Sequence, residues 1–203
     1  MPVRKFSQSG SLLTNRIDYS SMLAGNPVFV AGSFESIATV SVGAGGSSTI
    51  SFTSIPSTYN HLQIRAVARG NNGDVYDSAL IRVNSDSGSN YTFHQLAGDG
   101  SSASAGAVTP YSGFRAPEIT GANATSGIFG AFVCDISDYT NTNKYKTARI
   151  LGGDDRNGAG QIALTSGVWM NGNAITNITI IPVFGSLFAQ NSHFALYGIK
   201  GAA

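Results

Sequence analysis

The stretch HLQIRAVAR, residues 61–69, decides the fold class of this chain. Apolar side chains take every second position in it: Leu62, Ile64, Ala66 and Ala68. The positions between them are mostly polar: Gln63, Arg65, Val67 and Arg69. Successive side chains of a β-strand point to opposite faces of the sheet, so this period of two predicts a strand with one buried face.

Nine further segments after Phe34 have the composition and spacing of strands. They are ESIATVSV (35–42), SSTISFT (47–53), SALIRVN (78–84), NYTFHQLAG (90–98), GIFGAFVCDI (127–136), KTARILGG (146–153), QIALTSGVWM (161–170), AITNITIIPV (174–183) and SHFALYGIK (192–200). Clusters of Gly, Asn, Ser and Asp separate them, as turns do. Short, evenly spaced strands predict an all-β fold, an antiparallel, jelly-roll-like β-sandwich over residues 34–203.

Three local predictions follow within this domain. The Gly-rich turn GAGG (43–46) predicts that the strands on either side of it form a β-hairpin. The segment HFALYGIK (193–200) is long enough for a central position in a sheet. Residues 97–127 show no strand pattern and predict a long exposed loop. We expect this loop, from Asp99 to Gly127, to form an outer surface whose contact residues are Tyr111, Phe114 and Arg115.

Residues 1–33 are predicted to form a separate, extended N-terminal arm. Its apolar residues have a loosely helical spacing and are followed by Gly25 and Pro27, which stop helices. So short a helical segment is marginal in water by itself. The arm therefore needs a surface to dock on, either its own domain or a neighbour. We expect its docking face to consist of Leu12, Leu13, Ile17, Tyr19, Met22 and Leu23.

The chain is poor in charge for its length. Charged residues make up 11% of its 203 residues and the net charge is +1, against roughly 25% charged residues in typical soluble domains. This composition lacks the basic surface that binds nucleic acid or anionic lipid, so we expect neither a nucleic-acid nor a membrane partner. Low charge also weakens repulsion between copies, which favours close assembly.

The residue types that perform catalysis occur in no recognised arrangement. The single cysteine, Cys134, lies in an apolar run, where a free thiol packs as a small hydrophobe. The histidines His61, His94 and His193 stand apart, each in or beside a predicted strand. The sequence contains no G-x-S-x-G nucleophile elbow. We therefore expect a protein without enzyme activity, metal or cofactor.

Two acidic pairs and one tryptophan leave alternatives open. Asp154 with Asp155, and Asp74 with Asp77, lie in Gly-rich turns, where carboxylates commonly accept hydrogen bonds from nearby backbone. The alternatives are a calcium site and the paired acids of a glycosidase. Trp169 is predicted to pack in the core, with stacking on a sugar as the alternative.

Several segments resemble structural proteins of tailed bacteriophages, cyanophages among them, which are described as tail-fibre-like or virion structural. The segments are FTSIPSTYNHLQIRAVAR (52–69), NYTFHQL (90–96), DISDYTNTNKYKTARILGG (135–153), SGVWMNGNAITNITI (166–180) and FALYGIKG (194–201). The opening KFSQSGSLLTNRIDYSSMLAGN (5–26) is similar to the short segments that begin many phage fibre and tail-associated proteins. The likeness extends over roughly residues 34–201 and supplies no catalytic or binding residues.

The resemblance implies a non-enzymatic virion component that is made in the cytoplasm of a bacterial host. One expected role is an appendage subunit, the knob of a tail or head fibre, anchored through residues 1–33. The alternatives are a capsid decoration protein that stabilises the head and a lectin-like module that binds a glycan of the host surface. The expected partners are other virion proteins of the capsid or tail, with the protein itself a homotrimer.

Overall fold

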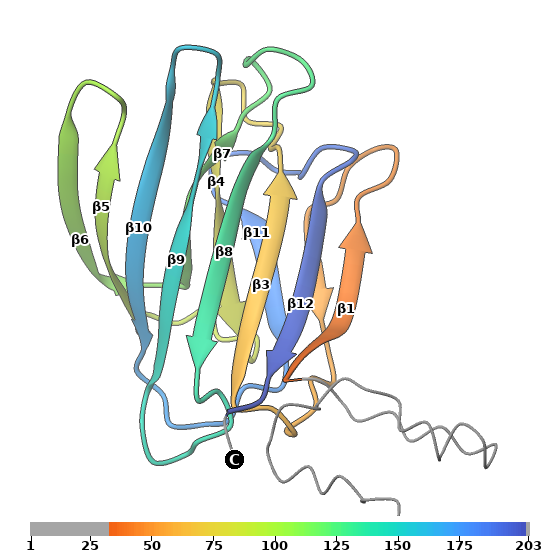
Figure 1. Ribbon diagram of the computed structural model, residues 1–203, viewed down its shortest axis with the longest axis vertical. Helices are drawn as coiled ribbons and strands as arrows, with labels where there is room; N and C mark the ends of the chain where they lie inside the picture. The colour runs from red at the N-terminus through yellow and green to blue at the C-terminus, as the bar shows by residue number, and fades with distance from the viewer. Residues whose placement is uncertain (1–32, 202–203) are drawn as a thin grey trace, which may run out of the picture.

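The computed structural model describes residues 33–201, and these form strands and turns without any helix (Figure 1). The predicted arm, with its helical segment and docking residues, lies almost wholly outside the described residues. The twelve strands are β1 (Phe34–Ser41), β2 (Ile50–Phe52), β3 (His61–Ala68), β4 (Tyr76–Val83), β5 (Tyr91–Gly98), β6 (Ala103–Tyr111), β7 (Phe114–Thr120), β8 (Gly130–Ser137), β9 (Lys146–Asp155), β10 (Gly160–Trp169), β11 (Ile178–Pro182) and β12 (His193–Ile199).

The strands form two sheets, and all neighbours within a sheet are antiparallel. The larger sheet has eight strands in the order β1-β12-β3-β8-β9-β10-β5-β6, and the smaller has four in the order β2-β11-β4-β7. Figure 1 shows the larger sheet in front and the smaller sheet behind it. The prediction of an all-β, sandwich-like fold is therefore confirmed at this level.

One hydrophobic core lies between the two sheets. The larger sheet contributes the predicted apolar face of β3, all four residues of which are buried, together with Cys134 and Ile150. The smaller sheet contributes residues such as Ile81, Ile119 and Ile180. Trp169 also belongs to this core, as the sequence predicted. Burial raises the pKa of the Cys134 thiol, so this cysteine is an inert packing residue.

The smaller sheet covers only part of the larger one. Its strand β7 packs against β8, β9 and β10, whereas residues 103–110 of β6 are exposed along their whole length. The hairpin of β5 and β6 thus carries the larger sheet past the region that the smaller sheet covers (Figure 1).

The predicted hairpin around the GAGG turn is wrong. β1 pairs with β12 in the larger sheet, and β2 pairs with β11 in the smaller one. The turn therefore carries the chain from one sheet to the other. Alternation of apolar residues identifies each strand but does not identify its neighbour, because both strands need only one buried face.

The predicted loop over Asp99–Gly127 is also wrong in part, because β6 and β7 lie within it. β6 cannot be recognised as a strand from the sequence, because both of its faces are exposed and its apolar residues do not alternate. β7 contains Pro117 and a register shift against β4, and the shift disrupts its period of two. The prediction that HFALYGIK forms a central strand is confirmed, because β12 lies between β1 and β3.

Candidate interaction surface

The outer face of the larger sheet, which points away from the smaller sheet, exposes a row of large aliphatic side chains. Val133 on β8 lies opposite Leu151 on β9, Leu151 opposite Leu164 on β10, and Leu164 opposite Leu96 on β5. Leu96, Leu151 and Leu164 are 59%, 53% and 49% exposed. Four neighbouring strands thus hold one continuous aliphatic row in solvent.

Two further aliphatic residues border this row. Ile162 on β10 is 64% exposed and Val67 on β3 is 47% exposed. We call the six residues the apolar face: Val67, Leu96, Val133, Leu151, Ile162 and Leu164. Single exposed aliphatic residues are ordinary, but a contiguous group of them on a rigid sheet marks a surface that other molecules contact.

Polar and charged side chains frame the apolar face. A second cross-strand row runs beside the first through Asp135, Arg149, Ser166 and His94. The guanidinium of Arg65 lies between the first row and the rings of Phe34 and Tyr197, 5.4 and 5.7 Å from their centroids. An apolar centre with a polar rim is the anatomy of a protein-binding surface.

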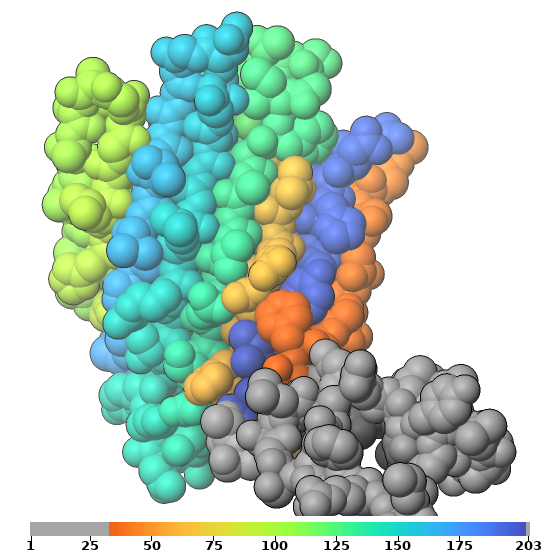
Figure 2. All heavy atoms as spheres, viewed as in Figure 1, coloured from red at the N-terminus to blue at the C-terminus, as the bar shows by residue number. Residues whose placement is uncertain are grey.

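Three hollows lie on this same face, which is turned toward the viewer in Figure 2. A hollow of about 310 Å³ lies beside Val67, Val133 and Leu151. Another of about 570 Å³ lies beside Leu96 and Leu164. The third, of about 680 Å³, lies where β8, β9 and β10 meet the turn after β5. The surface is therefore uneven enough to receive protruding side chains.

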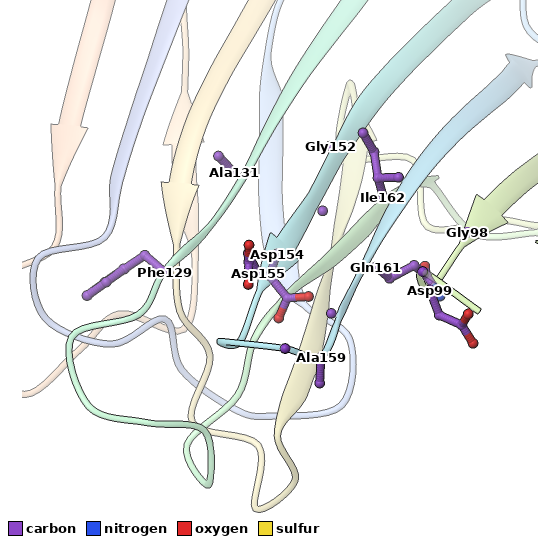
Figure 3. A pocket seen from close by; sticks show the side chains of 14 residues that line it. Gly98, Asp99, Phe129, Ala131, Gly152, Asp154, Asp155, Ala159, Gln161 and Ile162 are labelled. Atoms are coloured by element: carbon purple, nitrogen blue, oxygen red, sulfur yellow. The ribbon is translucent and has the colours of Figure 1, made fainter. Parts of the chain in front are cut away.

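Glycine lines much of the largest hollow (Figure 3). Its glycines are Gly98, Gly100, Gly152, Gly153, Gly158 and Gly160. Phe129 lies on one side, and Asp155 and Gln161 come from β9 and β10. Asp99 is largely occupied by its own turn, since the backbone N–H groups of Ser101 and Ser102 donate to its carboxylate at 2.9 and 2.7 Å. These hydrogen bonds hold the pKa of Asp99 well below its usual range.

An ionic cluster that is largely but not wholly buried lies nearby, where β7 packs against β9. The carboxylate of Asp154 is 3.6 Å from Arg156, and Arg156 is 3.6 Å from Glu118. The side chain of Asp154 has no exposed surface, and within the described part of the chain neither of its carboxylate oxygens has a hydrogen bond of good geometry. Thr120 and the backbone of Gln161 lie near enough to favour the charged form, but less strongly than burial opposes it. Burial raises the pKa values of both Asp154 and Glu118. Two acids thus share one arginine in a poorly solvated place.

The other acidic pair, Asp74 and Asp77, accepts hydrogen bonds from the backbone, but the predicted turn position is wrong for Asp77, which lies in strand β4. The buried carboxylate of Asp77 accepts hydrogen bonds from the backbone N–H groups of Phe184 and Gly185, at 3.1 and 3.2 Å. It thereby ties the loop after β11 to β4. Between residues 33 and 201, no group of three or more His, Cys, Asp or Glu side chains is placed to hold a metal ion.

The three histidines stay apart in the fold. His61 accepts a hydrogen bond through Nδ1 from the backbone N–H of Asp138, at 3.0 Å. His94 and His193 are exposed on the outer face and line different hollows. No two of them meet, so the structure brings together no histidine site.

The predicted contact residues of the outer loop have three different environments. Phe114 is fully buried, with its ring edge-on to that of Tyr91 at 5.2 Å, so it offers no surface to a partner. Tyr111 is half-buried and packs against Phe93. Arg115 is half-buried, and its guanidinium lies 5.0 Å from the centre of the Phe184 ring. Phe114 is buried because β7 joins the smaller sheet rather than a loop.

The apolar face is the feature that the sequence prediction missed. A signal for it exists in pairs of adjacent apolar residues, such as Ile150 with Leu151 in β9. Adjacent residues of a strand point to opposite faces, so such a pair places one apolar side chain on the solvent side.

No protein-family model, no curated protein and no solved structure matches this chain. The resemblance to phage proteins therefore stays a prediction from the sequence segments. Residues 33–201 contain no helix that is long and apolar enough to cross a membrane.

Proposed function

We propose that the protein is a non-enzymatic structural protein of a bacteriophage virion. In this proposal it is a surface appendage, the knob of a tail or head fibre, that joins other virion proteins. The observation that carries the proposal is the apolar face, a rigid and nearly uncharged surface suited to permanent contact with another protein. The low charge of the whole chain favours the same close assembly.

The proposed fold type is a jelly roll, which is common in virion proteins. Without the two hairpins β5–β6 and β9–β10, eight strands remain, in the orders β1-β12-β3-β8 and β2-β11-β4-β7. Among these eight strands the first in the chain pairs with the last, the second with the second to last, and so on inward. The pairs are β1 with β12, β2 with β11, β3 with β8 and β4 with β7. A long antiparallel hairpin that rolls up into two sheets has this order. The two extra hairpins widen one sheet and carry part of the apolar face.

The proposed anchor is the segment 1–33, with Leu12, Leu13, Ile17, Tyr19, Met22 and Leu23 as its docking residues. These residues lie outside the described part of the chain, and their role rests on the sequence pattern. The proposed oligomer is a homotrimer, the usual symmetry of phage fibres.

Immunogold electron microscopy tests this function. Antibodies raised against residues 34–203 are applied to phage particles from lysates of the host whose phage encodes the chain. Gold on the tail or on projecting fibres supports the appendage. Gold spread evenly over the head supports the alternative of a decoration protein. Labelling no stronger than with pre-immune antibody would overturn the assignment to a virion.

A second candidate function, binding of a host-surface glycan, is favoured by the glycine-lined hollow. Its glycine floor allows close approach, and Phe129, Asp155 and Gln161 offer an apolar ring face, a carboxylate and an amide to a sugar. Glycan-array binding that is lost in the variants Asp155→Ala and Gln161→Ala, but retained in Asp99→Ala, would support this function. No binding above background to any glycan would count against it.

A further inference from the structure

The two sheets have four edge strands: β1 and β6 in the larger sheet, and β2 and β7 in the smaller one. An edge strand presents unpaired backbone N–H and C=O groups, and such an edge pairs readily with a strand of another molecule. Natural sheets block this pairing with charges, proline, bulges or very short strands. The four edges of this protein differ in how well they are blocked.

Three of the edges carry such devices. β1 contains Glu35, which pairs with Lys200 at 3.2 Å, and has an irregular register between Ser36 and Ala38. β2 is only three residues long. β7 carries Arg115, Pro117 and Glu118, and its register also shifts. These edges are poor templates for a further strand.

The edge formed by β6 carries such devices only near its C-terminal end, where Pro110 lies and the register against β5 shifts between Val108 and Tyr111. The strand has nine residues, and the eight from Ala103 to Pro110 are all exposed. No charged side chain occurs anywhere between Ser101 and Gly113. Its first seven residues are small or medium-sized and all have a backbone N–H, since proline appears only at Pro110. Figure 1 shows β6 as the outermost strand, with nothing beside its free side.

We propose that two copies of this chain pair through β6, antiparallel about a two-fold axis, so that their larger sheets form one continuous sheet. Pairing about a two-fold axis requires a strand that is complementary to itself. The β6 edge meets this requirement, because a second β6 brings neither like charge nor a bulky side chain opposite it. A charged strand of another protein would find no opposite charge on this edge.

The geometry of the apolar face supports the same pairing. Leu96, at one end of the aliphatic row, lies opposite Ala105 of β6. Joining two β6 strands therefore brings the apolar faces of both copies onto one side of one sheet, with small residues at the seam. This inference does not rest on the virion assignment, because it uses only the edge and the face.

The expected dimer is weak when formed by this contact alone. A strand of nine residues is about 30 Å long and a sheet about 10 Å thick, so the contact covers about 300 Å² of each copy. Stable interfaces cover about 800 Å² of each partner. Association should therefore depend on concentration, or be strengthened by other contacts in an assembly.

Disulfide trapping of the full chain tests the pairing directly. The only native thiol, Cys134, is buried and does not compete. Single variants Ala103→Cys, Ala105→Cys and Ala107→Cys place a thiol along one face of β6, and Ser41→Cys places one at the exposed end of β1 as the control. Under mild oxidation we expect dimers with β6 thiols, most strongly at the position nearest the axis, and few with Ser41→Cys. Equal trapping at β1 and β6, or none at β6, would overturn the proposal.

Sedimentation velocity provides the second measurement. Ala105→Lys places like charges near the axis, and Thr39→Lys makes the matched change on the β1 edge. We expect Ala105→Lys to weaken self-association by about tenfold or more, with Thr39→Lys unchanged. Both positions are exposed, so unchanged thermal unfolding will verify the fold of each variant. Unchanged association of Ala105→Lys would overturn the pairing.

The measurement also separates this inference from the proposed homotrimer. If the chain is a trimer, two-fold pairing yields hexamers, and Ala105→Lys leaves trimers. If the trimer proposal fails, pairing yields dimers and the variant leaves monomers. Open-ended polymers would indicate that β6 pairs with β1 of the next copy, which contradicts the two-fold arrangement.

Discussion

At the scale of single residues, the carboxylate of Asp154 is the most informative group for pH dependence. It is buried, has no hydrogen bond of good geometry within the described residues, and shares Arg156 with Glu118. Burial raises the pKa of Asp154 above its value in the unfolded chain. Between those two pKa values the folded protein binds more protons than the unfolded one. The free energy of unfolding therefore falls as pH rises through this window.

We accordingly predict that Asp154→Asn raises the unfolding temperature at pH 7. The gain should disappear below about pH 4, where the aspartate of the native protein is protonated in both states. Arg156 keeps Glu118 as its partner in this variant. Thermal unfolding from about pH 3 to 8 measures the effect, with Asp155→Asn as the exposed neighbouring control. An identical pH profile for Asp154→Asn and the native protein would contradict the prediction, because it would show that burial of this carboxylate does not lower the free energy of unfolding.

Lys146 is a buried lysine whose ammonium group has three hydrogen-bond acceptors. Its ammonium donates hydrogen bonds to the carbonyls of Asn141, Lys144 and Gly172, at 2.6, 3.0 and 3.2 Å. The side chain thereby fastens the loop before β9 to the loop after β10.

Lys146→Met keeps the length of this side chain and removes the three hydrogen bonds. We expect it to lower the free energy of unfolding by about 2 kcal/mol, because it leaves three partly buried carbonyls without this partner. Urea denaturation measures the change. The control Lys144→Met removes only a surface ion pair with Asp138 and should cost less than about 1 kcal/mol. A similar cost for both variants would contradict the structural role of Lys146.

At the scale of strands, sequence reasoning succeeds where one face is buried and fails where that condition is absent. All ten strands with a clear apolar pattern exist, and the alternation in β3 predicts its buried face residue by residue. β6 has no buried face and so carries no pattern. Strand partners were not predictable either, because pairing β1 with β12 requires knowledge of residues about 160 positions apart in the chain. The apolar face was missed because the sequence does not show which face of each strand the smaller sheet covers and which face stays in solvent.

The difference between the two faces of β9 can be tested with neighbouring residues. Leu151 is half-exposed on the outer face and Ile150 is buried on the inner one. We expect the double variant Leu151→Thr, Leu164→Thr to change the free energy of unfolding by no more than about 1 kcal/mol. It should also bind less of an apolar dye such as ANS.

Ile150→Thr serves as the control, and it should cost about 2–4 kcal/mol because it puts a hydroxyl in the core. Equal destabilisation by the inner and outer changes would mean that another part of the chain covers the apolar face.

At the scale of the whole molecule, the core formed by the described residues joins both sheets. We expect removal of residues 1–26 to leave the unfolding temperature of the remaining chain unchanged within about 2 °C, since all twelve strands that form this core are retained. The single tryptophan, Trp169, reports on this core by fluorescence. The same truncation should abolish incorporation into particles if residues 1–33 are the anchor. Normal incorporation of the truncated chain would refute the anchoring role.

The pairing of β1 with β12 has a mechanical consequence. Phe34 lies opposite Ile199, and the backbone N–H of Lys200 donates to the carbonyl of Ser33 at 2.9 Å, so the two ends of the described chain lie side by side. Tension that separates these ends would break the hydrogen bonds between β1 and β12 one after another, starting at the Phe34–Ile199 pair. Tension applied across the sheet, between the segment before β1 and the β6 edge, would instead load the ladders of all its strands in series. The direction of pull therefore determines whether this domain gives way at its open end or across the width of its larger sheet.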